Sequence, residues 1–329
     1  MLTDVISTAD KFKRALAAHD LQAEKSLIAA YQGLYARVRD LTDALILEIA
    51  NAGDSVTMGQ VRHMDRYKRL MSTITNELTD YKSFVKTEIG IASSENIVLG
   101  ESNARAMVAV SLGNSSIAGK FNVLNPEVIR NLLGFLSPEG ELYKRLDKLP
   151  GFVADNVSQA IIDGVGLGMN PKNIARGITN AFGMGLTDSM RMMRTVQLWS
   201  YRESNRASYN ANSDIVRGWL WYADIGGKAC ASCIAMHGTE HPLSEPLTDH
   251  WNGGCSMLPI TIGEKVNIQS GEDWFTQQSA EYQKQSLGAG KYEAWKDGKF
   301  EFSQLSSEKH DDVYGTIRVE TSLSDLLSQ

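Results

Sequence analysis

The sequence predicts a mainly α-helical protein with one small β element that carries a cluster of cysteines and histidines. Three observations lead to this fold class. Two long stretches have apolar residues alternating four and three positions apart, which is typical of a helical hairpin. Two short stretches rich in aromatic and β-branched residues indicate strands. All three cysteines of the 329-residue chain lie between these predicted strands.

The composition is that of an ordinary globular protein, with 43% hydrophobic residues to fill a core. A net charge of -6 argues against binding a phosphate backbone by overall electrostatics. The N-terminus has no apolar core of the signal-peptide type, and no long uncharged apolar run occurs. We therefore expect a soluble protein that is made in the cytoplasm and has no membrane partner.

The N-terminal region, residues 1–120, is predicted to be a long antiparallel helical hairpin followed by a linker. Asn51 and Gly53 interrupt the apolar pattern, and each half needs a partner to bury its seam. The segment from Gly90 to Asn125 is rich in Gly, Ser and Asn, so we assign it as the linker. The seam residues are Leu27, Tyr31, Leu34, Val38, Leu41 and Leu45, then Tyr67, Met71, Ile74, Leu78, Tyr81 and Val85.

The middle of the chain contains repeated helix starts. Asn125, Ser137 and Asn170 each precede a proline, which is a favourable N-cap arrangement and predicts a set of short helices. The glycines of GVGLGMNP lack the spacing of a dinucleotide-binding loop, so we read a turn between two helices. A long helix is predicted to begin at Thr187 and end near Asn212.

The character of the sequence changes at Val216. VRGWLWYAD is predicted to be one strand and SMLPITI, Ser256 to Ile262, a second. These two strands enclose a β-hairpin-like Cys/His element at residues 216–262. The element lies inside a predicted central helical domain of residues 121–265. Residues 266–329 form a short α-rich C-terminal extension, with helices ending at Gly288 and Gly298. A short strand near Ile317 and an apolar anchor at Leu323, Leu326 and Leu327 complete it.

The cysteines have the spacing of a zinc site. Cys230 and Cys233 form a CxxC pair, which lets two thiolates reach one ion from a single turn. His250 and Cys255 follow at a separation typical of the second half of a small zinc ribbon or knuckle. These four ligands would close a tetrahedron, so we predict structural Zn and no catalytic residue. The alternative is three cysteines without a metal, because the second half-site is not a CxxC pair.

A second pattern, which contains two histidines, lies close in the sequence to these predicted zinc ligands. HGTEH, from His237 through Glu240 to His241, matches the HxxEH pattern of a zinc peptidase family. That chemistry needs a helix, so that both histidines share one face and the carboxylate can activate a metal-bound water. Gly238 lies inside the pattern, and Pro242 disfavours helical geometry at the preceding residue. A zinc-dependent hydrolase or peptidase is thus the alternative function, and we expect the segment to be a connecting turn.

The order of the motifs resembles a known family. GVGLGMNPKNIARGI, TDSMRMMRT, GWLWYAD, CASC, HG, HWNGGC and LPI follow one another as in the phage Mu F-like minor head protein family, also called the phage head morphogenesis domain. The resemblance covers roughly residues 125 to 265. The C-terminal region also resembles an extension often seen on such proteins, at Trp274, Gln283, Gly288, Trp295 and Gly298.

The chain departs from the family at one ligand. The family's second cluster reads HPNCRC, and His250, Asn252 and Cys255 keep their places while Gly253 stands where the first cysteine would be. The resemblance leaves Cys230, Cys233, His250 and Cys255 as the minimal ligand set, with His237 as a substitute ligand.

The resemblance implies a non-enzymatic minor head protein with no small-molecule substrate. Its expected partners are the phage portal protein, the major capsid protein or a scaffold protein. Its expected place is the inner head of the virion near the portal, after assembly in the host cytoplasm, with a part in DNA packaging or ejection. An internal DNA-contacting virion protein is a further alternative, through a local basic face of Lys172, Arg176, Arg191, Arg194, Arg202 and Arg206.

Overall fold

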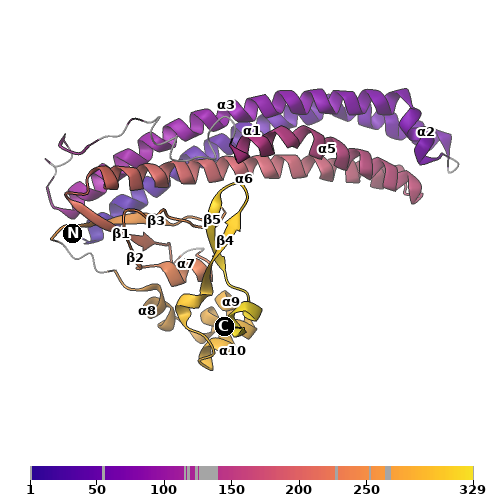
Figure 1. Cartoon of the computed structure of the whole chain (residues 1–329). Helices are drawn as coiled ribbons and strands as arrows, with labels where there is room; N and C mark the ends of the chain where they lie inside the picture. The colour runs from indigo at the N-terminus through magenta and orange to yellow at the C-terminus, as the bar shows by residue number, and fades with distance from the viewer. Residues whose placement is uncertain are drawn as a thin grey trace. The chain divides into compact units, whose positions relative to one another are not determined.

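The computed structural model describes residues 2–53, 56–114, 116, 119–122, 125, 140–226, 229–251, 253–263 and 268–328. The described residues are mainly helical with two small antiparallel sheets, which confirms the predicted mainly α fold class (Figure 1). The chain divides into two compact units, described separately below. The first is made of Met1–Ala18, Ser93–Ser137 and Thr195–Gln329, and the second of His19–Ala92 and Pro138–Arg194. The three sequence domains stay a prediction.

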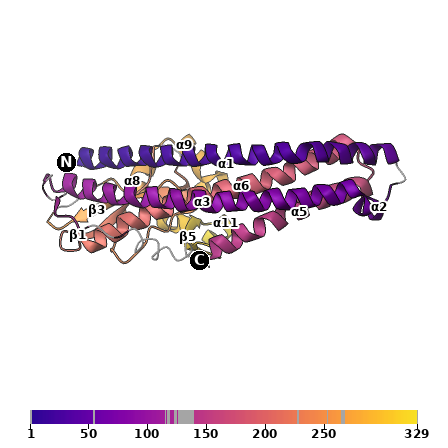
Figure 2. The ribbon, with the colours of Figure 1, turned by 90° about the horizontal axis from the view of Figure 1, so that it is seen from above.

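Two long helices form the N-terminal hairpin. They are α1, Leu2–Ala52, and α3, Asp65–Ser111. In the second unit they lie side by side (Figure 2), and the rings of Tyr31 and Tyr81 meet edge to face with centroids 4.7 Å apart. Most of the predicted seam is buried, whereas three of its positions, Leu41, Tyr67 and Met71, are half-buried. The amphipathic pattern therefore identified the contact face of both helices.

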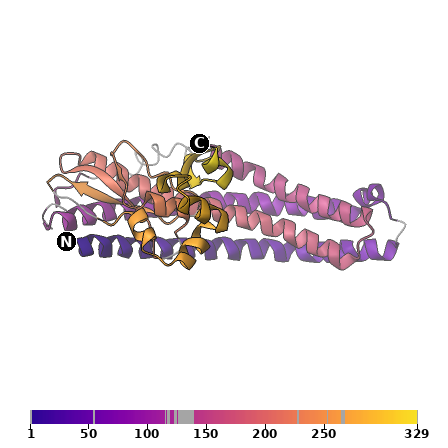
Figure 3. The same cartoon turned by 90° about the horizontal axis from the view of Figure 1, so that it is seen from below.

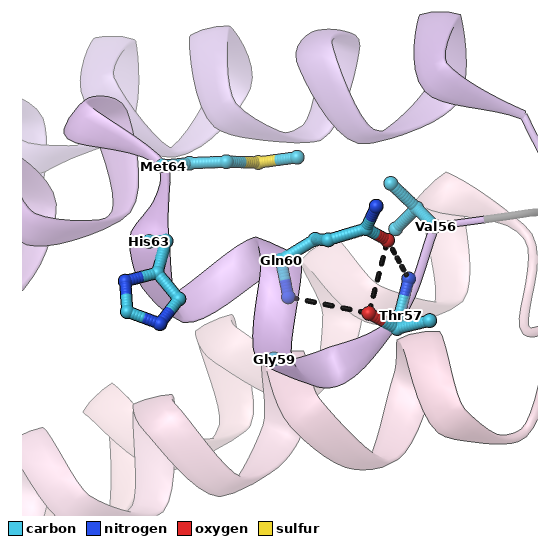
Figure 4. A pocket seen from close by; sticks show the side chains of 6 residues that line it. All are labelled: Val56, Thr57, Gly59, Gln60, His63 and Met64. Carbon is cyan, nitrogen blue, oxygen red and sulfur yellow. Dashed lines mark hydrogen bonds between the residues drawn. The ribbon is translucent and has the colours of Figure 1, made fainter.

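A short helix, α2, Met58–His63, connects the two long ones. Its N-terminus is closed by a capping box (Figure 4). The hydroxyl of Thr57 accepts a hydrogen bond from the Gln60 amide at 3.3 Å, and the Gln60 side chain accepts one from the Thr57 amide at 2.8 Å. Two amide donors that a helix start leaves unpaired are thus satisfied.

The predicted linker is wrong over residues 90–111, because α3 continues to Ser111. Several of its buried positions carry small or polar side chains in place of the large apolar ones of the seam. Asn103 donates a hydrogen bond from its side-chain nitrogen to the side-chain oxygen of Asn205 at 2.8 Å, so the two buried amides pair across the helices. These residues pack where a helix needs close approach rather than bulk, so a search for large apolar side chains missed them. They are Ser93, Asn96, Gly100, Asn103 and Ser111.

The set of short helices expected in the middle of the chain is also wrong. Two long helices occur there, α5, Glu141–Gly166, and α6, Pro171–Ala211. The turn between them and the cap at Asn170 are confirmed, since the Asn170 side chain accepts a hydrogen bond from the Asn173 amide at 3.0 Å. Thr187 lies inside α6 and donates to the carbonyl of Gly183 at 2.9 Å, so it starts no helix. The helix starts expected at Pro126 and Pro138 fall outside the described residues.

Both predicted strands are confirmed in a sheet of order β2-β1-β3. The strands are β1, Val216–Tyr222, β2, Glu240–His241, and β3, Ser256–Thr261, all antiparallel. Alternate side chains of β1 enter different cores. Leu220 packs with Val5 of α1 and Met107 of α3, whereas Trp219 and Trp221 pack with the cysteines. Both faces of the sheet are therefore buried.

The C-terminal segment adds short elements to the first unit. One predicted helix is split in two, because Ser279 caps a new start by accepting a hydrogen bond from the Tyr282 amide. Gly288 and Gly298 have φ angles of 75° and 67°, which confirms the predicted helix ends. Leu326 is buried, but Leu327 is exposed and is no anchor. The elements are α8, Gly271–Thr276; α9, Ala280–Leu287; α10, Ala289–Lys296; a 3-10 turn, Phe302–Leu305; β4, Ser306–Asp311; β5, Gly315–Glu320, which contains the predicted strand at Ile317; and α11, Leu323–Leu327.

None of the helices in the described part of the chain combines the length and the apolar character needed to cross a membrane.

A close contact between α3 and α6 in the first unit yields a stability prediction. A Cβ added at Gly100 would lie 2.4 Å from the backbone oxygen of Tyr201, so α3 and α6 would have to separate. We expect Gly100→Ala to lower the free energy of unfolding by roughly 1–3 kcal/mol. Gly90→Ala is the matched control on the same helix, because a Cβ there meets nothing within 4 Å. It should raise stability by about 1 kcal/mol. Urea unfolding followed by circular dichroism measures both, and equal effects would contradict the close contact.

Candidate metal centre

A short helix places the first two cysteines side by side. α7, Ala231–Met236, begins directly after Cys230, and the two sulfur atoms of Cys230 and Cys233 lie 3.5 Å apart. The two sides of α7 enter different cores, with Cys233 and Met236 packing toward the tryptophans of β1 and Ile234 packing with Phe275. Packing on both sides thus fixes the helix that carries the CxxC pair.

His250 comes to both cysteines from the segment before β3. Its Nε2 lies 3.3 Å from the Cys230 sulfur and 3.2 Å from the Cys233 sulfur. Its Nδ1 lies 2.8 Å from the carbonyl oxygen of Trp251, so Nδ1 carries a proton, and Nε2 faces the sulfurs and offers them a lone pair only when it is deprotonated. Ligands of a tetrahedral zinc ion lie about 3.4–3.8 Å apart, and the three observed separations are only a few tenths of an ångström shorter.

The predicted ligands gather around Cys233. Cys230, Cys233 and His250 form one group whose ligand atoms all lie within 4.8 Å of one another. Cys233, Asp249 and Cys255 form a second group by the same measure. The described residues therefore place the four ligands expected from the sequence in two groups that share Cys233, and the second group adds one carboxylate that the sequence analysis did not include. This cluster could hold a metal ion.

Asp249 is that additional group, and its side chain is almost wholly buried. Its Oδ1 accepts a hydrogen bond from the His250 amide at 2.9 Å, and its Oδ2 accepts one from the Cys255 amide at 3.1 Å. One carboxylate thus holds the backbone of both residues of the second half-site. No spacing rule marks an acid directly before the histidine, so the sequence carried no signal for this role.

The same carboxylate explains why residue 253 is a glycine. A Cβ added at Gly253 would lie 2.1 Å from Oδ2 of Asp249 and 2.4 Å from Oδ1. Any side chain there would have to displace the carboxylate. The chain therefore has Asp249 in the space that a side chain at position 253 would need.

Arg202 of α6 fixes Asp249 in place. Its Nη2 donates to Asp249 Oδ2 at 2.8 Å and to the Gly253 carbonyl at 2.7 Å, and its Nε donates to the Cys255 carbonyl at 3.0 Å. Both charged side chains are buried, at 3% and 1% exposure.

The expected basic face is wrong at Arg202, which lies in the interior. It is also wrong at Arg206, which pairs with Glu203 and donates to the Leu243 carbonyl.

The charges of the cluster are strongly coupled. The hydrogen bond from Cys233, aided by His250, lowers the pKa of Cys230 to about 4, although burial opposes this change. The hydrogen bond with Cys230, the contact with Cys255 and burial raise the pKa of Cys233. The hydrogen bond with Cys230 and the charge of Asp249 raise the pKa of His250 to about 9. Without a metal, His250 supplies the positive charge that the Cys230 thiolate and Asp249 require.

Burial opposes ionisation of Asp249, yet Arg202, His250 and the Cys255 amide keep its pKa below the usual range. A carboxylate that stays ionised in the interior adds negative charge beside the three sulfurs. Arg202 balances this charge at 2.8 Å, which is why the ionised form persists in the interior.

The HGTEH segment has a different geometry from the one that the peptidase alternative requires. It forms a turn, with Gly238 at φ +85°, followed by β2. His237 accepts a hydrogen bond from the Ala223 amide at 3.1 Å and belongs to neither metal-type group. Burial lowers its pKa to about 4, so it stays neutral.

The other two residues of the pattern also have partners of their own. His241 stacks on Trp219 with ring centroids 4.3 Å apart and contacts the Glu245 carboxylate at 2.8 Å. Glu240 faces Arg217 at the surface. The helix that would align the two histidines is absent from this described segment, which is a turn as the sequence predicts.

Comparison with known proteins assigns no relationship. No protein-family model matches the chain, and neither the curated proteins nor the solved structures contain a significant match.

Loss of Arg202 should lower the free energy of unfolding more than loss of a surface ion pair. Arg202→Met would leave the Asp249 carboxylate buried without its cation, at a cost of about 3–5 kcal/mol in the free energy of unfolding. Arg217→Met is the control, because its 3.5 Å contact with Glu240 is half-exposed and should be worth less than about 1 kcal/mol. Chemical unfolding at neutral pH measures both. Similar costs for the two variants would contradict the central role of the buried pair.

Proposed function

We propose that the chain is a non-enzymatic structural protein whose Cys/His cluster binds one zinc ion. The observation that carries this proposal is the triangle of Cys230, Cys233 and His250, with sides of 3.2–3.5 Å. Thiolate and imidazole are the ligands that structural zinc prefers, and Cys255 supplies a fourth donor next to Cys233.

The surroundings favour a structural metal over a catalytic one. Catalytic zinc keeps one coordination position for water or substrate, whereas four protein ligands fill the tetrahedron. Cys233 and Cys255 are buried, and Asp249 is occupied by Arg202 and two backbone amides. The role that fits these residues is to tie α7, the loop before β3 and α6 together.

We further propose that the protein acts in phage head assembly, in contact with the portal, the capsid or a scaffold, and that it resides in the virion. The support is the order of the motifs that resemble Mu F-like minor head proteins, from the glycine turn before α6 to the LPI of β3. The long helices α1 and α3 give such a protein an extended surface for assembly contacts.

Metal analysis tests the zinc proposal. The purified chain should carry one zinc ion, and Cys230→Ser and Cys233→Ser should each lose it and unfold roughly 10 °C lower because metal binding adds directly to folding stability. Glu240→Gln should keep both the zinc and the unfolding temperature. A variant at Glu240 that keeps its metal but loses a hydrolytic activity would favour the zinc hydrolase that uses His237, Glu240 and His241. A wild-type chain that folds equally well without metal would contradict the proposal.

Particle analysis tests the assembly proposal. Head particles from infected cells should contain the chain in a few copies each, and it should co-purify with the portal protein. A phage that lacks the gene should form heads with defective DNA packaging or ejection. Normal packaging and ejection without the gene would exclude this role, and the zinc result would stand independently.

A further inference from the structure

The sulfur atoms of Cys230 and Cys233 lie close enough to form a disulfide after a small movement. They are 3.5 Å apart as free thiols, whereas a disulfide joins two sulfurs at about 2.05 Å. Cys230 precedes the first residue of α7 and Cys233 is in its first turn, so both side chains leave the same short stretch of backbone. Rotations about the side-chain bonds can close the remaining distance of about 1.5 Å.

The three cysteines differ in their access to an oxidant. Cys230 is half-buried, whereas Cys233 and Cys255 are each only 4% exposed. An oxidant in the solvent therefore meets Cys230 first. Among the described residues, Cys230 and Cys255 belong to different groups of neighbouring ligand atoms, and Cys233 belongs to both. Cys233 is thus the thiol in reach of an oxidised Cys230, which selects this disulfide over one between Cys233 and Cys255.

A disulfide in this pair would remove two of the four proposed zinc ligands at once. Zinc binds the thiolate form of cysteine, and a sulfur in a disulfide carries no such charge. His250 and Cys255 would remain, and two ligands do not complete the tetrahedron. The disulfide and the proposed zinc site are therefore mutually exclusive states of the same two cysteines.

Both halves of the cluster have support that does not depend on a metal. α7 lies between the sheet of β1 and the C-terminal elements, which Figure 1 shows from the side and Figure 3 from below, with Met236 in one core and Ile234 in the other. The Asp249 carboxylate accepts the amides of His250 and Cys255 at 2.9 and 3.1 Å. Loss of the metal lowers stability but leaves the donors near their places, so reduction can rebuild the site.

We propose that Cys230 and Cys233 form a reversible disulfide in the presence of a peroxide and that this oxidation releases the zinc ion. The inference rests on the zinc binding proposed above and adds the regulation of that site.

The chemistry takes two steps. The Cys230 thiolate attacks one oxygen of hydrogen peroxide, which gives a sulfenic acid and hydroxide. The Cys233 thiolate then attacks the Cys230 sulfur, the S–S bond forms, and the second oxygen leaves as hydroxide. Two protons from the solvent convert both hydroxides to water, so two electrons have passed from the sulfur pair to the peroxide. A dithiol such as dithiothreitol reverses the reaction by thiol–disulfide exchange and is itself oxidised.

Zinc release and cysteine mapping on the full chain test the switch. Zinc is counted in the reduced protein, and hydrogen peroxide is then added together with a chromogenic chelator. The chain should lose its zinc under peroxide and bind added zinc again after dithiothreitol treatment. The oxidised protein is unfolded and alkylated with N-ethylmaleimide before and after reduction, followed by peptide mass spectrometry. Cys255 should be alkylated before reduction, and Cys230 and Cys233 only after it.

Two variants locate the bond. Cys255→Ser should still form the disulfide, whereas Cys230→Ser should leave Cys233 and Cys255 as thiols. If either variant fails to fold, the mapping of the wild type decides. Zinc that stays bound under peroxide, a disulfide between Cys233 and Cys255, or zinc that does not rebind after reduction would overturn the switch alone. A reduced wild type without zinc would overturn the zinc site as well, so the two failures are distinguishable.

Discussion

The buried ion pair of Arg202 and Asp249 is the interaction on which the Cys/His cluster depends. Asp249 accepts hydrogen bonds from the backbone amides of His250 and Cys255, and Arg202 donates hydrogen bonds to the carbonyls of Gly253 and Cys255. One guanidinium and one carboxylate therefore fix the backbone conformation of the segment that carries His250 and Cys255. A buried ion pair is costly to desolvate, and this one is retained where it satisfies backbone groups that no regular strand or helix would satisfy.

Two kinds of residues have different roles in the cluster. The thiols and the imidazole provide donors for a soft or borderline metal, whereas the pair fixes where those donors point. The first half-site needs no such help, because α7 is held between two apolar cores and positions Cys230 and Cys233 by helix geometry alone. The loop with His250 also packs, through Leu247 in the core and Trp251 against Tyr314, but charge and hydrogen bonds hold the backbone next to His250 and Cys255.

The features predicted correctly from the sequence are those that depend on hydrophobic periodicity and on the chemistry of metal ligands. The seam of α1 and the first half of α3, the strands β1 and β3, and the four candidate ligands follow from side-chain type and spacing. The second half of α3 was missed because Gly100 and Asn103 pack by being small or by pairing amides, which no apolar pattern records. Asp249 and Arg202 were missed for a related reason. They are charged residues far apart in the chain, and only the tertiary fold pairs them.

The contact between Gly253 and the Asp249 carboxylate has a consequence for how this loop can evolve. The two positions compete for one volume, so a substitution at either is acceptable only in the context of the other. A descendant that acquired a side chain at position 253 would first have to shorten or remove the acid at 249, and Arg202 would then lose its counter-ion. The three positions should therefore change as a set, and homologous sequences should show glycine at 253 wherever the acid and the arginine are both kept.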